Sequence, residues 1–343
     1  MYRIIRSIEN IKSYTFFKDK VIGISENQII DLDTGNVLYV AEYSLQYVHC
    51  KNLICYVNDI YGNGFYFKDY SSTISVSETF IETAVDEKYL LVSKNGSTQL
   101  LNIELDSLTQ LSNDKLFTYE IDNGIVFYKQ KDKVLAISIF EERELWRIDL
   151  SSFGQYNDRG KQKSYAVKSI LGIWKDLLLI QLSNFRLIAL ESATGNLKYD
   201  LMLADKFATD PQNYLSTSSP MLLDLENERI VWLTNSSLIH IDLTEFSPKL
   251  VKDYFDVPKE NLWRFNKSTL HNGYLYFTGD YGMEYAVSTR FGVLNPETGE
   301  VLWQEQLEKT GGLSSPPQVA EDKLCVLGSK GTLHIFKKKL NPR

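Results

Sequence analysis

Short apolar runs occur in pairs along the whole chain, and a few turn-forming residues separate the two runs of each pair. Residues 21–25 with 28–32 form the first pair, and residues 324–327 with 332–336 form the last. Such runs, rich in Val, Ile, Leu, Tyr and Phe and bounded by Gly, Asn, Asp and Ser, are typical of β-strands. The six pairs between them are 53–57 with 64–68, 89–93 with 99–103, 125–128 with 134–139, 177–182 with 186–190, 230–233 with 238–242, and 274–278 with 290–294.

The spacing of these pairs indicates a repeat architecture. Eight pairs in 343 residues give about 43 residues per unit, the period of four-stranded propeller blades. We predict an all-β fold, a β-propeller of eight four-stranded blades in a single domain spanning residues 1–343. Seven blades is the alternative, because residues 51–112 are the least regular. The last unit runs out of chain after its third strand, so we expect residues 1–7 to pair into that blade and close the ring.

A second pattern recurs three times with the same internal register, at residues 31–39, 191–199 and 295–303. Each copy has a polar residue four positions before the glycine of a Thr-Gly pair and an aromatic residue four positions after it. We expect Thr-Gly to form a tight turn between the third and fourth strands, where glycine adopts a positive φ at little cost. The polar residue then hydrogen-bonds to the turn, and the aromatic residue packs between blades.

The residues of several units resemble the repeat of pyrroloquinoline-quinone (PQQ)-like propellers. Residues 218–222, followed by 230–232 and 238–242, are similar to the small-residue and proline start and the two strands of that repeat. The unit ending in Asn295, Thr298-Gly299 and Trp303 matches best, whereas an earlier unit keeps only Trp146. The resemblance implies a propeller. In enzymatic members it also implies PQQ and a calcium ion in the central funnel, with a Glu/Asn/Asp set and, in many, a disulfide between adjacent cysteines.

The chain lacks the features of that chemistry. It has no adjacent cysteine pair and no Asp-x-Asp-x-Asp-Gly calcium loop. No Gly-x-Ser-x-Gly motif accompanies the scattered histidines at positions 49, 240, 271 and 334. We therefore expect no catalytic residues, no bound cofactor and no metal site. We expect a non-enzymatic protein, and a small-ligand or sugar-binding or PQQ-dependent dehydrogenase-like propeller is the alternative.

The cysteines and the charge bear on the compartment and the partners. His49 and Cys50 point to opposite faces of a strand, so with Cys55 they do not make a zinc site. With Cys325 the three cysteines form no obvious disulfide framework, which fits a reducing compartment such as the cytoplasm. A net charge of −7 argues against nucleic-acid binding, and the lysines at 337–339 are interpreted as solvated charge on an edge strand. No apolar run is long enough to enter a membrane.

The loops give the best indication of a binding surface. If the strands of a blade run A to D outward, the B–C loops and the D–A links open on one side, and the A–B and C–D turns open on the other. The long segments 151–164, 204–216, 256–266 and 279–289 all fall on the first side. Aromatic residues with arginine are typical of binding hot spots. The predicted partner-binding residues are Tyr156, Arg159, Tyr214, Trp263, Arg264, Tyr281 and Tyr285.

These observations predict a non-catalytic cytoplasmic propeller that binds a partner protein through its long-loop face. One version is a bacterial immunity protein, an acidic domain that neutralises a toxin. A scaffold subunit of a larger complex is another version. A small ligand held in the funnel remains open as the alternative.

Overall fold

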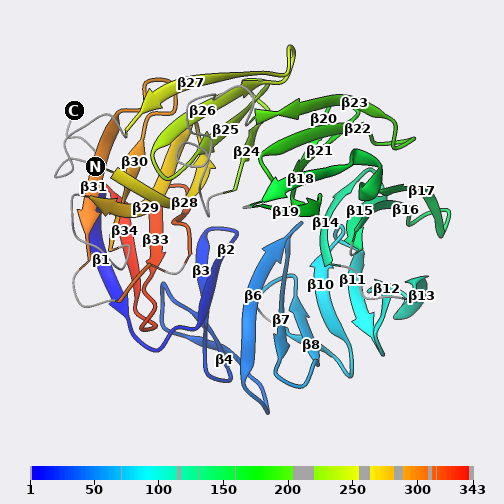
Figure 1. Ribbon diagram of the computed structural model, residues 1–343. Helices are drawn as coiled ribbons and strands as arrows, with labels where there is room; N and C mark the ends of the chain where they lie inside the picture. Colours follow the sequence, from blue (N-terminus) through cyan, green and yellow to red (C-terminus); the bar gives the residue numbers. More distant parts are fainter. Residues whose placement is uncertain are drawn as a thin grey trace. The chain divides into compact units, whose positions relative to one another are not determined.

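The computed structural model describes residues 2–70, 72–113, 117–130, 132–158, 160–203, 220–254, 263–281, 289–307, 311–313 and 315–339. The chain divides into two compact units. Figure 1 shows the strands, coloured by their position in the sequence. Unit 1 is Met1–Lys115 with Gln306–Arg343, and unit 2 is Leu116–Glu305. Eight four-stranded sheets form the blades, so the fold is an eight-bladed β-propeller, as predicted, and the seven-bladed alternative is wrong. The prediction of a single domain stays a prediction.

Unit 1 holds four blades, named by their order along the chain. Blade 1 is β2 (Ser13–Phe17), β3 (Lys20–Ser25), β4 (Gln28–Asp31) and β5 (Val37–Val40). Blade 2 is β6 (Leu45–Lys51), β7 (Ile54–Asp59), β8 (Gly64–Phe67) and β9 (Ile74–Val76). Blade 3 is β10 (Phe80–Ala84), β11 (Tyr89–Lys94), β12 (Ser97–Asn102) and β13 (Ser107–Ser112). Blade 8 is β32 (Gln318–Ala320), β33 (Lys323–Leu327), β34 (Leu333–Lys338) and β1 (Tyr2–Ile8).

Unit 2 holds the other four blades. Blade 4 is β14 (Phe117–Asp122), β15 (Ile125–Gln130), β16 (Lys133–Ser138) and β17 (Arg143–Asp149). Blade 5 is β20 (Val167–Trp174), β21 (Leu177–Leu182), β22 (Arg186–Glu191) and β23 (Leu197–Met202). Blade 6 is β24 (Leu222–Asp224), β25 (Arg229–Leu233), β26 (Ser237–Asp242) and β27 (Ser247–Asp253). Blade 7 is β28 (Trp263–His271), β29 (Tyr274–Tyr281), β30 (Arg290–Leu294) and β31 (Val301–Gln306).

The two strands predicted for each unit are the second and third strands of its blade in all eight cases. The N-terminal strand completes blade 8, as predicted, because β1 pairs antiparallel with β34 from Tyr2↔Lys338 to Ile8↔Leu333. One detail of the sequence interpretation is wrong. Lys337 and Lys338 end an internal strand and not an edge strand, because β34 lies between β33 and β1.

The hydrophobic core lies between blades. Every residue of β7 and β8 is buried, since neighbouring blades cover both faces of these strands. In unit 1, one cluster joins Tyr14 and Val21 of blade 1 to Cys325 of blade 8. In unit 2, a cluster around the fully buried Trp232 joins blades 5 and 6. The outer strands contribute less, and four of the six residues of β23 are exposed.

The recurrent Thr-Gly segments form the turns between the third and fourth strands, as predicted. The Asp31 carboxylate accepts hydrogen bonds from the amides of Asp33 (3.0 Å) and Thr34 (3.2 Å). The Gly35 amide, at φ +85°, donates to the Asp31 carbonyl at 2.7 Å. The turns that contain Gly195 and Gly299 repeat this glycine hydrogen bond at 2.8 Å. Because the turn satisfies its own backbone groups, it needs few residues.

The preceding blade holds each of these turns. Arg6 of blade 8 donates to the carbonyl of Leu32, in the turn of blade 1, at 2.8 Å. The Trp146 indole of blade 4 donates to the Ser192 carbonyl in the turn of blade 5 at 2.8 Å. Tyr254 directly follows the last strand of blade 6, and its hydroxyl donates to the Gly299 carbonyl of blade 7 at 2.6 Å. The predicted inter-blade packing of Trp146 is therefore confirmed, and the repeat marks a connection between blades.

Gly195 provides a test of this connection. A Cβ at Gly195 would lie 2.8 Å from the Trp146 ring, and the glycine has φ +74°. Gly273 has φ +72° and no atom within 4 Å of such a Cβ. We expect Gly273→Ala to lower the free energy of unfolding by about 1 kcal/mol through φ alone. Gly195→Ala adds steric displacement of Trp146 and is expected to cost about 2–3 kcal/mol. Urea denaturation of both variants measures the difference, and equal costs would contradict the proposed packing.

Candidate functional site

The predicted binding residues that the structure describes lie on three strands of unit 2, namely β18 (Gln155–Asp158), β28 and β29. Tyr156 lies on β18, which pairs with β19 (Lys161–Ser164) to form a hairpin in the link between blades 4 and 5. A short 3₁₀ helix, η1 (Leu150–Phe153), precedes the hairpin. Arg159, Tyr214 and Tyr285 lie outside the described residues.

Aromatic, cation–π and ion-pair contacts hold the base of this hairpin. The Tyr156 ring centroid lies 5.1 Å from that of Tyr165. The Arg186 guanidinium stacks over the Tyr165 ring at 4.6 Å and donates to the Asp200 carboxylate at 2.7 Å. All four residues of β19 are exposed. The link therefore projects polar side chains from a fixed base.

Trp263 and Arg264 belong to a strand. The predicted link 256–266 was too long, because β28 begins at Trp263. The Trp263 side chain is only 7% exposed, and its ring centroid lies 5.2 Å from that of Phe277 and 5.0 Å from that of Tyr281. This packing gives Trp263 a structural role in the core of unit 2. Arg264 is exposed on the same strand, and partner binding by Arg264 and Tyr281 stays a prediction.

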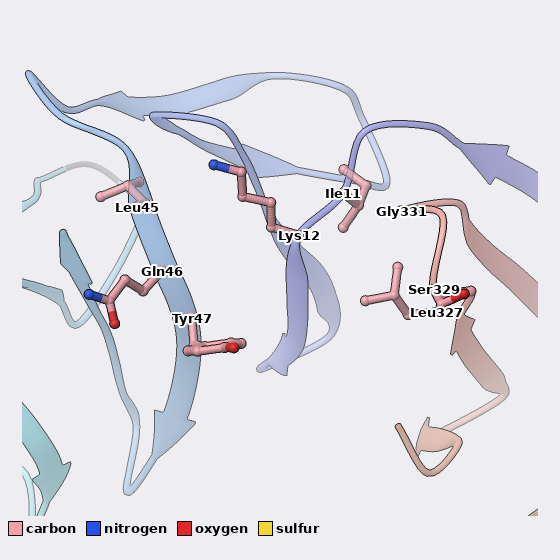
Figure 2. A pocket seen from close by; sticks show the side chains of 9 residues that line it. Ile11, Lys12, Leu45, Gln46, Tyr47, Leu327, Ser329 and Gly331 are labelled. Carbon is pink, nitrogen blue, oxygen red and sulfur yellow. The ribbon is translucent and has the colours of Figure 1, made fainter. Parts of the chain in front are cut away.

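A hollow of about 590 Å³ opens in unit 1 on the side of the B–C loops and D–A links. Figure 2 shows its walls, which come from the segment just before β2, the start of β6 and the loop between β33 and β34. Backbone hydrogen bonds fix these walls. The Ile11 amide donates to the Gly331 carbonyl at 2.8 Å, and the Leu45 amide donates to the Glu26 carbonyl at 2.9 Å. The hollow is therefore held open by the blades themselves.

Polar side chains line this hollow. The Lys12 ammonium donates to the Ser44 hydroxyl at 2.7 Å, and the Gln46 amide donates to the Asp59 carbonyl at 3.0 Å. Tyr47 is 63% exposed, and Figure 2 shows its ring on β6. Within the described part of the chain, Lys12 forms no ion pair. A cation, an amide and an aromatic ring are thus available to a bound group.

A second hollow, of about 630 Å³, lies between the loops of blades 2 and 3 in the same unit. The Asp59 carboxylate shapes its rim, because it accepts from the amides of Tyr61 and Asn63, both at 2.9 Å. The Asn63 side chain in turn accepts from the Glu78 amide at 3.0 Å. Tyr61 and Asn63 lie between β7 and β8, the two strands predicted from residues 53–57 and 64–68.

Exposed side chains lie between the two hollows, and sequence reasoning missed them. Tyr43 is 39% exposed, Ile60 54% and Tyr61 70%. The rings of Tyr43 and Tyr61 meet edge to face at 4.6 Å. Only long segments were predicted to bind a partner, so the prediction did not include these short loops. The available signal was the large residues Tyr43 and Ile60-Tyr61, in short loops that usually consist of Gly, Asn or Asp.

The histidine and carboxylate cluster closest in type to a catalytic set lies in unit 2. Arg229 donates to the carboxylates of Asp224 at 2.8 Å and Glu297 at 2.9 Å, and lies 3.3 Å from Nδ1 of His240. Burial and the Arg229 charge lower the pKa of His240 to about 4. Since Glu297 lies in the Thr-Gly turn of blade 7, this cluster connects blade 6 to that turn. Among the described residues, no group of three or more His, Cys, Asp or Glu could hold a metal ion.

The cysteines differ from the sequence-based expectation. Cys50 on β6 and Cys55 on β7 form a disulfide, with Cα atoms 4.1 Å apart. The two-residue turn at Asn52 and Leu53, both with positive φ, sets the register that places the cysteines opposite each other. The interpretation that the cysteines form no disulfide is therefore wrong, because it ignored the register of the hairpin. Cys325 is a buried free thiol. The compartment stays a prediction, and no helix in the described ranges is long and apolar enough to cross a membrane.

Comparison with known proteins identifies the fold. No family model and no curated protein matches the chain. The computationally designed protein Ika8 is similar with a TM-score of 0.64 and 12% identity over 96% of each chain. BamB from Moraxella catarrhalis, a PQQ-like β-propeller, has a TM-score of 0.60 and 11% identity over 98% of this chain and 100% of its own. Sqt1 from Saccharomyces cerevisiae has a TM-score of 0.62 and 11% identity over 99% and 98%. At these identities the likeness shows the propeller fold alone.

The cluster around His240 predicts a pH dependence of stability. A histidine in the unfolded chain has a pKa of about 6.5, whereas burial and the Arg229 charge lower the pKa of folded His240 to about 4. The unfolded chain therefore binds the extra proton first, and the free energy of unfolding falls as pH drops from about 6.5 towards 4. His240→Gln removes this titration but keeps Asp224 and Glu297. We expect a smaller loss of stability in that variant, measured by urea denaturation from pH 7 to 4. Identical pH profiles would show that His240 is not held neutral.

Proposed function

We propose that this chain is a non-catalytic propeller that binds a partner protein through the B–C loops and D–A links of its blades. The observation that carries the proposal is the difference between the two sides of each blade. On the turn side, the Thr-Gly turns are occupied by the preceding blade through Arg6, Trp146 and Tyr254. On the loop side, polar and aromatic groups stand exposed on fixed backbone. Loops on a rigid scaffold are the usual position of binding residues.

Two loop-side features support protein binding in particular. The β18–β19 hairpin projects from a base built of aromatic rings and the Arg186–Asp200 pair. Tyr47 and Tyr61 supply large rigid side chains, which lose little conformational entropy when they bind. Both features are pre-organised, so a partner need not order them.

The narrower form of the proposal is a bacterial cytoplasmic protein that neutralises a toxin. The net charge of −7 suits a basic partner, since opposite charges accelerate encounter. A scaffold role in a larger complex uses the same surface. Both forms require a stable complex with another protein.

A ligand-binding propeller is the second candidate. The hollow at Lys12, Gln46 and Tyr47, of about 590 Å³, falls in the size range of small-molecule sites. Stoichiometric uptake of PQQ with calcium, or reduction of a dye by alcohols or sugars in their presence, would favour this candidate.

Site-specific photo-cross-linking in the native host tests the proposal. A benzophenone amino acid replaces one of two loop-side residues, Gln162 of β19 or Tyr47 of β6. The matched controls are Leu105 (74% exposed) and Phe140 (71% exposed), which lie in C–D turns on the opposite side of their blades. We expect a discrete cross-linked protein from at least one loop-side position and none from the controls. Cross-links from the turn positions alone, or from none of the four, would contradict protein binding by the loop side.

A further inference from the structure

A group of exposed side chains lies between the two hollows of unit 1 and is here called the tyrosine ridge. It consists of Tyr43, Tyr47, Ile60 and Tyr61. A single exposed apolar residue on a protein surface is ordinary. Four of them gathered in two short segments of blade 2 and the link before it are not, and tyrosine is among the residues that dominate binding energy at protein interfaces.

The ridge is rigid before anything binds. The Ile60 amide donates to the Ser44 carbonyl at 3.0 Å, which joins the two segments. Asp59 fixes the Tyr61 backbone through its side chain at 2.9 Å. The edge-to-face contact of Tyr43 with Tyr61 orients both rings. A ligand would therefore meet a preformed apolar surface and would not have to order it.

The ridge connects the two hollows. On one side the Lys12 ammonium reaches Ser44, the residue next to Tyr43, and Lys12 and Tyr47 line the first hollow. On the other side Tyr61 and Glu78 line the second hollow. A path thus runs from Lys12, over the paired rings, to Glu78. Such a path suits an extended chain better than one compact small molecule.

The two ends of the path carry opposite charge. Within the described residues, Lys12 and Glu78 form no ion pair. At the first hollow, Lys330 follows the lining residue Ser329 in the sequence. At the second hollow, the Glu82 carboxylate accepts a hydrogen bond from the lining residue Ser93 at 2.5 Å. Glu42, nearer the middle, is engaged with the Tyr43 hydroxyl. Covering Lys12 and Glu78 without opposite charges would leave both desolvated and unpaired, which is costly.

We propose that the tyrosine ridge binds an extended protein segment that places an acidic side chain at Lys12, an apolar side chain on the paired rings of Tyr43 and Tyr61, and a basic side chain at Glu78. This inference rests on the proposed function and specifies the chemistry of the partner segment. It adds residues of blades 1 to 3 that the long-loop interpretation did not include.

Selection from a random twelve-residue peptide library, displayed on phage, tests the ridge with purified full-length protein. We expect enriched peptides in which acidic, apolar and basic residues occur in line. In fluorescence anisotropy, Tyr61→Ala should weaken binding of a selected synthetic peptide about tenfold, since it removes a ring from the centre of the surface. Leu105→Ala is the matched control, because it removes an exposed apolar side chain from the turn side of the same unit. It should leave binding unchanged.

Charge reversal tests the assigned direction. The double variant Lys12→Glu with Glu78→Lys should bind the first peptides more weakly, and selection on it should enrich peptides with the acidic and basic ends exchanged. Circular dichroism and the thermal midpoint establish that each variant is folded. Absence of enriched peptides, or binding unaffected by Tyr61→Ala and by the charge reversal, would overturn the proposal. Binding of an uncharged oligosaccharide at the ridge in place of peptides would also overturn it.

The two proposals fail separately. If Gln162 cross-links to a host protein but phage selection enriches no peptide, protein binding by the loop side is supported and the ridge is rejected as its site. Selected peptides that depend on Tyr61 and Lys12, with no cross-linked protein in the host, would support the ridge and reject the proposed function.

Discussion

The structure depends on one constraint, that the central strands of a blade are apolar on both faces and only a neighbouring blade can cover them. Every side chain of β7 and β8 is buried, although each strand belongs to a sheet of only four. A single blade would expose both faces to water. Stability therefore lies in the contacts between blades, at clusters such as that of Tyr14 with Cys325 and that around Trp232.

The need for blades to pack against each other explains the sequence of the recurrent Thr-Gly turn. Glycine at the turn leaves room for a side chain of the blade before it, as Trp146 over Gly195 shows. The polar residue four positions earlier satisfies the turn backbone, so the turn stays short and rigid. The Arg229 cluster, with a neutral His240, makes the same connection in another way. Polar and charged residues that look like candidate catalytic groups in the sequence therefore connect neighbouring blades in the structure.

On the opposite side of each blade, hydrogen bonds such as that from the Ile11 amide to the Gly331 carbonyl also connect neighbouring blades. The loops on this side nevertheless include insertions such as the β18–β19 hairpin and exposed rings such as Tyr43 and Tyr61. Both are held by backbone and side-chain hydrogen bonds, which makes them rigid without burying them. A rigid exposed surface is what a binding protein requires, and this is the physical basis for placing function on the loop side.

Much of the fold could be predicted from the sequence, because strands buried on both faces appear as apolar runs that need no partner to be recognised. The pairing of the N-terminal strand into the last blade could be predicted because the last unit has only three strands of its own. The site was less accessible. Trp263 was assigned to a loop because an aromatic residue at the start of a strand looks the same as one in a link. Cys50 and Cys55 were judged unpaired because only hairpin register places them together. Tyr61 was missed because exposure depends on neighbours distant in sequence.

The central claim is that the turn side serves stability and the loop side serves binding. Hydrogen–deuterium exchange of the protein, alone and with its captured partner, tests it most directly. The account predicts slow exchange at the amides of Gly35, Gly195 and Gly299, each bonded to a carbonyl within its turn, and no change there when the partner binds. New protection should appear in loop-side segments such as 41–47, 60–63 or 155–164. Protection that appears at the turns on binding and leaves these loops unchanged would contradict the account.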